Sequence, residues 1–307
     1  MKSRYGKVAV LLAVILAVST LLTVLLGRYP KPQTEELSVV AAFYPMYTAA
    51  LQVVGKTDGV SVSCLTAPGA GCLHDYQLSP VERAQLDAAD VLVLNGGGME
   101  SFLNAVIPSI PSLFCIDTTA DVSLLCGDAH EHDHDHDHAV NAHAWIDPVR
   151  YAAQVQAICD GLCEVDPAHA ESYRHNTAAY LQKVQTVAAQ LTATDITVDG
   201  AVLFHESMAY VAERLELREL ARLPIGEETA ASAGELAQVA QALRGQAVLF
   251  LYDDQYPLQY TSLTAHAETA AVVRWNTAVV PQNGVADEDA WLYAMQRNIQ
   301  TLKEVLS

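Results

Sequence analysis

A run of alternating histidine and acidic residues carries the most evident chemistry in this sequence. Its five histidines are separated by one Glu and three Asp: His130, His132, His134, His136 and His138. A run of this composition has no core-forming side chains, so we expect an exposed, flexible segment. It predicts labile capture of divalent metal but does not select one metal. The alternatives are a pH-responsive polar loop and a solvated charge run.

Three more histidines stand where a strand or loop ends and a helix begins. His74 lies in Cys-Leu-His-Asp-Tyr, His143 lies ahead of Asp147-Pro148, and His205 follows the apolar run 201–204. Taken singly, such a histidine is more often a hydrogen-bonded structural residue than a ligand. Three of them at the carboxyl side of strands can converge on one cleft, where neutral imidazoles suit zinc. The remaining histidines are expected to be helical, exposed and without a role: His169, His175 and His266.

The segments that must position these histidines alternate between strand and helix patterns. Short apolar runs, mostly β-branched, predict buried parallel strands at 38–44, 60–65, 91–95, 113–116, 201–204, 247–252 and 271–275. Strand and helix signals occur on both sides of one long helical stretch. This arrangement predicts an α/β fold of two lobes, with ligands in the cleft beyond the carboxyl ends of the strands.

The helix signals are of three kinds. Ser-x-x-Glu patterns at 79–82 and 232–235 predict capped helix starts. The stretch from Asp166-Pro167 to about 193 contains no further Pro or Gly and predicts a helix about 40 Å long. A last amphipathic helix is expected from about 287 to 306.

The N-terminal residues read as a targeting segment rather than as part of the fold. Lys2, Arg4 and Lys7 precede an uncharged run at 8–27, which as a helix would be about 30 Å long, the thickness of a hydrocarbon core. An uncleaved anchor and a cleaved signal peptide are both compatible with this run. Either one predicts that the body of the protein is exported.

Charge excludes one class of function. The chain has 36 acidic and 17 basic residues, and five of the basic ones lie within the first 32 positions. A body this acidic attracts cations and repels phosphates over long range, so we expect no nucleic acid binding.

Export would make the six cysteines candidates for disulfides. Their order suggests the pairs Cys64–Cys72, Cys115–Cys126 and Cys159–Cys163, although six cysteines allow fifteen pairings. Small buried hydrophobes or free thiols are the alternative.

Several segments together resemble one protein family over nearly all of residues 38–306. They are Ala-Ala-Phe43-Tyr44-Pro45, His74-Asp75-Tyr76, Asn95-Gly96 with Met99-Glu100, His143-Ala-Trp145-Ile-Asp147-Pro148, Asp166-Pro167, and His205-Glu206-Ser207 with Tyr210. In this order they are similar to the solute-binding component of zinc/manganese ABC importers, zinc-specific branch. The resemblance implies two lobes with parallel four-stranded sheets, joined by one long rigid helix. It also implies a metal site in the interlobe cleft and a His-rich loop.

The resemblance further implies that His74, His143 and His205 are the metal ligands. Histidine at the third position is typical of the zinc branch, where the manganese branch has Glu. The fourth position departs from the family, because Asn276 falls about where Asp is frequent. Asn276 or Glu206 is then a fourth ligand or lies just behind the ligands, and water is the alternative. Asp253 and Asp254 match an acidic family position and are not expected to be ligands.

We therefore predict an extracytoplasmic zinc-binding protein, a monomer and not an enzyme, that delivers Zn²⁺ to the permease subunit of an ABC importer. Residues 8–27 would attach it to the membrane. The alternatives are a manganese-binding member of the family, a zinc hydrolase with three histidines and water, and an adhesin or metal buffer. The predicted parts are a signal or anchor (1–27), a linker (28–37), an N-terminal lobe (38–165) with the His-rich loop (128–142), a linking helix (166–194) and a C-terminal lobe (195–307).

Overall fold

The computed structural model describes residues 36–69, 73, 76–127, 140–223 and 230–306. The N-terminal apolar run, His74 and the histidine-rich segment lie outside the described residues. The chain divides into two compact units, Met1–Leu37 and Ser38–Ser307, so both predicted lobes belong to the second unit. Among the described helices, none is long and apolar enough to cross a membrane.

Two four-stranded sheets with the same strand order form the framework. The first contains β1 (Leu37–Ala41), β2 (Val60–Cys64), β3 (Val91–Leu94) and β4 (Phe114–Asp117), in the order β2-β1-β3-β4. The second contains β7 (Gly200–Leu203), β8 (Glu219–Arg222), β9 (Ala247–Asp253) and β10 (Thr269–Trp275), in the order β10-β9-β7-β8. In each sheet the earliest strand lies between the next two, so the chain reverses its winding direction beside that strand. Such a switch point leaves a crevice at the carboxyl ends of the strands.

The central strands of the sheets are apolar on both faces. Every residue of β7 is buried, and six of the seven residues of β9 are buried as well. Strands covered on both faces are typical of parallel sheets. β9 pairs in parallel with both β7 and β10, and β3 pairs in parallel with β1 and β4. The predicted α/β fold with parallel four-stranded sheets is confirmed.

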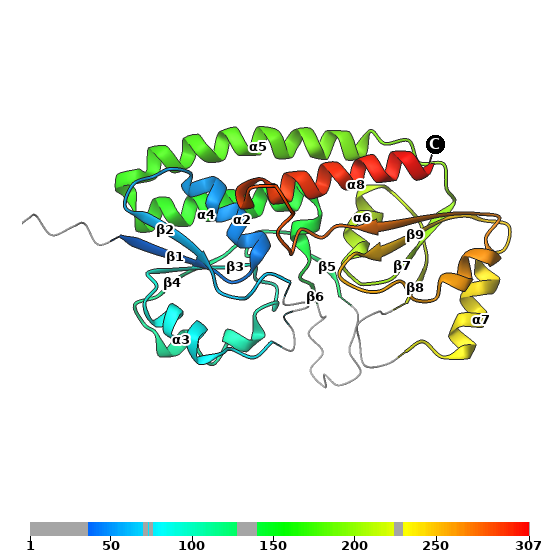
Figure 1. Cartoon of the computed structure of the whole chain (residues 1–307), viewed down its shortest axis with the longest axis horizontal. Coiled ribbons are helices and arrows are strands. Elements are labelled where there is room, and N and C mark those ends of the chain that lie inside the picture. Colours follow the sequence, from blue (N-terminus) through cyan, green and yellow to red (C-terminus); the bar gives the residue numbers. More distant parts are fainter. Residues whose placement is uncertain (1–35, 70–72, 74–75, 128–139, 224–229, 307) are drawn as a thin grey trace, which may run out of the picture. The chain divides into compact units, whose positions relative to one another are not determined.

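Helices pack around both sheets (Figure 1). The first sheet is accompanied by α2 (Tyr44–Val54), α3 (Pro80–Asp87) and α4 (Pro148–Val165), the second by α6 (Met208–Arg214), α7 (Ala233–Ala242) and α8 (Ala290–Leu306). The capping boxes predicted from the sequence are present at α3 and α7. In each, the serine side chain accepts the backbone N–H of the glutamate, which in turn accepts the serine N–H.

One long helix, α5 (Ala170–Thr192), runs along both sheets in Figure 1 and packs on α2, α4 and α8. It begins four residues later than the sequence predicted. Pro167–His169 form a 3-10 turn, in which the Asp166 carboxylate is bonded to His169 Nδ1 and Tyr173 Oη. With 23 residues, α5 is about 35 Å long. A continuous helix of that length connects the helices of both sheets.

Some strands differ from the prediction. β1 ends at Ala41, three residues early, because Pro45 stands at the start of α2. β8 was missed because Glu-Leu-Ala-Arg has no apolar run, and the short hairpin of β5 (Leu125–Cys126) and β6 (Val140–Asn141) was also missed.

The predicted disulfide between Cys115 and Cys126 is wrong for this structure. Both are free thiols, as are Cys64, Cys159 and Cys163. Cys115 is half-buried and packs against the apolar cluster beside β3, whereas Cys126 is exposed on the β5–β6 hairpin. The two side chains therefore lie in different surroundings, one against the apolar cluster and the other exposed. Cys72, the predicted partner of Cys64, lies outside the described residues.

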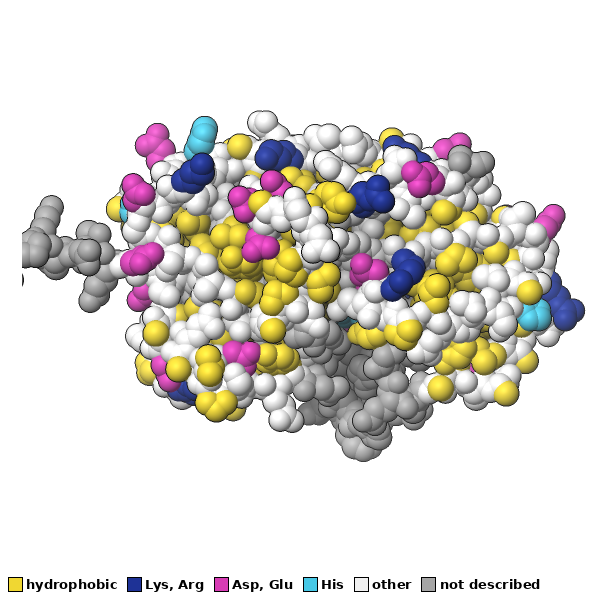
Figure 2. Space-filling model, viewed as in Figure 1, with side chains coloured by type: hydrophobic (Ala, Val, Ile, Leu, Met, Phe, Trp, Pro, Cys, Tyr) yellow, Lys and Arg dark blue, Asp and Glu magenta, His cyan; other side chains and the backbone are white. Residues whose placement is uncertain are grey.

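On the face shown in Figure 2, Asp and Glu side chains are scattered over the surface and separated by apolar and uncharged side chains. This spread, together with a net charge of −19, favours long-range attraction of cations over a single acidic binding patch.

Candidate metal centre

The switch points of the two sheets face one small cavity. His205 follows β7 by two residues, and Gln255 follows β9 by two residues. From the first lobe, Phe43 follows β1, and His143 precedes the 3-10 turn Ala144–Ile146 that leads into α4. The cavity measures about 10 Å³, room for roughly one water-sized sphere. The described residues that line it are Phe43, Leu73, Met99, His143, Trp145, His205, Gln255, Tyr256 and Val279.

His143 and His205 come together across this cavity. Their ring centroids are 5.0 Å apart and the rings are nearly perpendicular, at 89°. Both residues are buried, with 4% and 8% of their surface exposed. The structure thus brings together two of the three histidines that the sequence analysis expected at one cleft, and the third, His74, lies outside the described residues.

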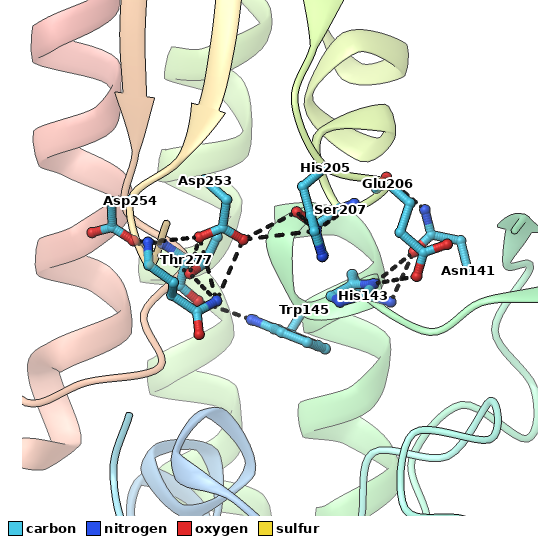
Figure 3. A network of polar contacts seen from close by, with 10 residues as sticks. Asn141, His143, Trp145, His205, Glu206, Ser207, Asp253, Asp254 and Thr277 are labelled. Carbon is cyan, nitrogen blue, oxygen red and sulfur yellow. Dashed lines mark hydrogen bonds and ion pairs between the residues drawn. The ribbon is translucent and has the colours of Figure 1, made fainter. Parts of the chain in front are cut away.

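The Nδ1 atom of His143 is held by two oxygen atoms (Figure 3). Asn141 Oδ1 lies 2.9 Å from it and Glu206 Oε1 lies 3.3 Å from it. An amide oxygen and a carboxylate oxygen can only accept, so the hydrogen of the imidazole belongs on Nδ1. Metal-binding histidines commonly donate one ring N–H to such an oxygen and coordinate through the other nitrogen.

The Nδ1 atom of His205 meets a serine and, behind it, a carboxylate. Ser207 Oγ lies 2.7 Å from Nδ1 and 3.2 Å from Asp253 Oδ2. Nδ1 can accept the backbone N–H of Ser207, 3.2 Å away, or it can donate to Oγ while Oγ–H donates to the carboxylate. The second arrangement satisfies Asp253 and puts the hydrogen on Nδ1. Ser207 and Asp253 are 0% and 2% exposed, so water does not compete for these bonds.

Burial also acts on the carboxylates behind His205. It raises the pKa of Asp253, which is opposed by hydrogen bonds from the Gln255 N–H and side chain and by the nearby His143. Burial and the adjacent charge of Asp253 raise the pKa of Asp254 to about 6. A cation bound nearby would favour the ionised form of both groups.

Hydrogen bonds and ion pairs tie the two lobes together around the cavity. Trp145 Nε1 donates to the Thr277 carbonyl, and Trp291 Nε1 donates to the Trp145 carbonyl, both at 2.9 Å. Arg214, at the end of α6, makes a bidentate pair with Asp147, whose carboxylate is fully buried at the start of α4. These contacts fix the distance between His143 and His205.

The other predicted site residues have different positions. Glu206 lies beside His143, as described above. Asn276 Oδ1 accepts the N–H of Ala278, its backbone bonds the side chain of Asn298, and it is absent from the described lining of the cavity. His74 lies outside the described residues, although its neighbour Leu73 lines the cavity. Within the described residues, no group of three or more His, Cys, Asp or Glu side chains is arranged to hold a metal ion.

Four residues around the site were missed or dismissed by sequence reasoning: Asn141, Ser207, Asp253 and Gln255. Asp253 is the last residue of β9, and Ser207 and Gln255 lie just past strand ends. Their position beyond the carboxyl end of a parallel strand was a usable signal. No comparable signal pointed to Asn141, because it lies in a hairpin strand that the sequence did not reveal.

The chain has two α/β lobes with the same strand order and a long helix that packs along both. Two histidines face each other in a buried cavity between the lobes. These features define a two-lobe solute-binding fold. The chain belongs to the ZnuA family, described as the zinc-uptake complex component A, periplasmic, whose model matches residues 39–305. The family comprises metal-binding solute-binding proteins and not enzymes, which removes the hydrolase alternative.

Three similar proteins are described with different metals. The zinc-binding lipoprotein AdcA of Streptococcus pneumoniae is 26% identical over 286 residues, 88% of this chain and 56% of AdcA. The chain thus spans little more than half of that relative. The iron-binding protein YfeA of Yersinia pestis is 25% identical over 252 residues, 80% of this chain and 79% of YfeA. The structure of FpvC of Pseudomonas aeruginosa in complex with Ni²⁺ is 20% identical, with a TM-score of 0.70, covering 88% of this chain and 97% of FpvC.

Proposed function

We propose that this protein binds one Zn²⁺ between its lobes, outside the cytoplasm, and delivers it to the permease subunit of an ABC importer. The observation that carries the proposal is the state of the two histidines. His143 and His205 face each other at 5.0 Å, and both have Nδ1 beside oxygen atoms that can accept its hydrogen. Each ring then directs the lone pair of Nε2 toward the metal, the state in which imidazole binds zinc.

The third ligand in this proposal is His74. Leu73 lines the cavity, so the chain reaches the site one residue before His74. Three neutral imidazoles from two lobes would close around the metal, with one further position to complete a tetrahedron.

Zinc is the favoured cargo because this shell is rich in nitrogen. Hard manganese prefers oxygen-rich shells of higher coordination number, whereas zinc accepts four ligands with several imidazoles. The relatives do not decide the question, since YfeA is named for iron and FpvC was crystallised with nickel. A manganese-binding member of the family is the second candidate, favoured only by the Asp253 carboxylate 3.8 Å from His205 Nδ1.

The other parts of the chain have roles in the same proposal. Residues 8–27 would hold the protein at the membrane or direct its export, and residues 38–165 and 195–307 would be the two lobes of a monomer. The five histidines at 130–138 would capture zinc weakly near the cleft. Deleting 130–138 should remove zinc bound beyond one equivalent and leave one tight site, because flexible imidazoles lose entropy on ordering.

Zinc titration against a competing chelator tests the function. The wild type should bind one tight equivalent, and His143→Ala should weaken that binding severely because a ligand is lost. His175→Ala is the matched control, since His175 is exposed on α5 and should leave affinity unchanged. Equal zinc affinity for the wild type and the His143→Ala variant would contradict the proposal.

A further inference from the structure

The side-chain oxygen of Gln255 accepts no hydrogen bond from the described residues around it. This atom, Oε1, is buried. The residue lines the cavity together with His143 and His205. Buried amide oxygens are nearly always bonded, so an exception in the wall of a proposed metal cavity calls for an explanation.

The other end of the Gln255 amide is fixed. Nε2 lies 3.3 Å from both carboxylate oxygens of Asp253 and 3.2 Å from Thr277 Oγ1. A carboxylate accepts hydrogen bonds, so the NH₂ group must point toward Asp253 and the oxygen away from it. The Gln255 N–H also donates to Asp253 Oδ1 at 3.0 Å, which anchors the residue immediately after β9.

We propose that Gln255 Oε1 is an oxygen ligand of the metal bound between His143 and His205. The proposal rests on the function proposed above, because it takes the cleft as the metal site. It replaces Asn276, whose Oδ1 is bonded to the Ala278 N–H. The hydrogen bonds that Nε2 donates to the carboxylate polarise the amide, and this makes Oε1 a stronger ligand for a cation.

A neutral oxygen at this position has a consequence for the choice of metal. His143, His205 and Gln255 would offer the metal two imidazoles and one amide oxygen, none of which carries a formal negative charge. Zinc tolerates such a shell, whereas manganese binds better with carboxylate and additional oxygen ligands. Gln255 would thereby help the site to favour zinc, while Asp253 remains behind it as the acceptor that orients both Gln255 and Ser207.

The test compares Gln255→Met with Thr277→Val in the full chain. Methionine keeps the length of the side chain and removes the amide, and Thr277→Val removes a different hydrogen bond to Asp253 and to Gln255 Nε2 without touching Oε1. The probes are Zn²⁺, for affinity, and Co²⁺, whose visible absorption reports the number and type of its ligands.

Gln255→Met should lower zinc affinity by about 10-fold or more and change the Co²⁺ spectrum, while Thr277→Val should leave the spectrum as in the wild type. A wild-type Co²⁺ spectrum in Gln255→Met, or the same spectral change in both variants, would overturn the proposal. If Gln255→Met does not fold, a crystal structure of the zinc-loaded wild type decides. The oxygen should then lie roughly 2.0–2.2 Å from the metal, and a water in its place would refute the assignment. Failure of the proposed function would look different, because the wild type itself would then bind no zinc between His143 and His205.

Discussion

Replacing Ser207 by alanine should weaken zinc binding although Ser207 itself contacts no metal. Its Oγ stands between His205 Nδ1, at 2.7 Å, and Asp253 Oδ2, at 3.2 Å. Without Oγ, Asp253 Oδ2 lies 3.8 Å from Nδ1, beyond hydrogen-bond range, and the closer of the described contacts is the backbone N–H of residue 207, at 3.2 Å. That group is a donor, so Nδ1 would become the acceptor and the hydrogen would move to Nε2. Zinc would then have to displace this hydrogen before it could bind.

The size of the expected loss in zinc affinity follows from the burial of Ser207, whose Oγ bridges His205 and Asp253. Ser207 is 0% exposed, so no water can take over the position of Oγ without rearrangement. Losing a partner that orients a metal-binding histidine typically lowers metal affinity by about 10–100-fold, which corresponds to about 1.4–2.8 kcal/mol. The apo protein should lose only about 1 kcal/mol of unfolding free energy, the usual value of one hydrogen bond.

The assay is a chelator-competition titration of zinc, with Ser232→Ala as the matched control. Ser232 caps α7 in the same lobe, far from the cavity lining, so its loss should lower stability by about 1 kcal/mol and leave zinc affinity unchanged. If Ser207→Ala stays folded and binds zinc as tightly as the wild type, the inference that Ser207 sets the protonation of His205 is refuted.

Three more predictions follow from the same structure. Zinc affinity should fall steeply below about pH 6, because protons compete with the metal for imidazoles of reference pKa about 6.5; a flat affinity in titrations from about pH 7.5 to 5.5 would contradict a histidine site. Burial raises the pKa of Glu100 to about 7 from the model-compound value of 4.5, so the folded apo protein binds a proton there that the unfolded chain has already released. The free energy of unfolding should therefore fall as the pH rises from about 4.5 to about 7. Glu100→Gln should flatten this pH dependence in denaturant unfolding, and an unchanged slope would count against the raised pKa of Glu100. Arg214→Ala should cost about 3 kcal/mol of unfolding free energy, because it leaves the buried Asp147 carboxylate with Arg150 as its remaining charged partner. Arg83→Ala, which breaks an exposed pair with Asp87, should cost less than about 0.5 kcal/mol, and equal losses in the two variants would contradict this reading.

Much of the fold was predictable because its central strands are buried on both faces. Continuous apolar runs such as 247–252 can only be accommodated inside a covered sheet, and β9 occupies that stretch. The serine–glutamate pairs at α3 and α7 signal helix starts through local hydrogen bonds alone. β8 could not be found in this way, since its place at the edge of the sheet comes from pairing with β7, and its sequence has no apolar run.

The site was predictable only in part. His143 and His205 could be singled out by residue type and by their position after strands or before helices. Ser207 and Asp253 also lie at or past strand ends, but the way in which they and Asn141 orient the histidines depends on contacts made in three dimensions, which the sequence does not show. Asn276 was chosen from its place in the sequence, but the turn after β10 directs its oxygen to Ala278. Gln255 was identified as a candidate ligand through its unbonded oxygen and its position in the cavity wall.

Anomalous diffraction at the zinc absorption edge, from crystals of the untagged protein grown with one equivalent of Zn²⁺, tests the central claim most directly. A single strong peak should lie between the His143 and His205 rings, bonded to both Nε2 atoms and to His74. Zinc found only elsewhere in the chain, with no peak between these two rings, would contradict the claim that the interlobe cavity is the metal site.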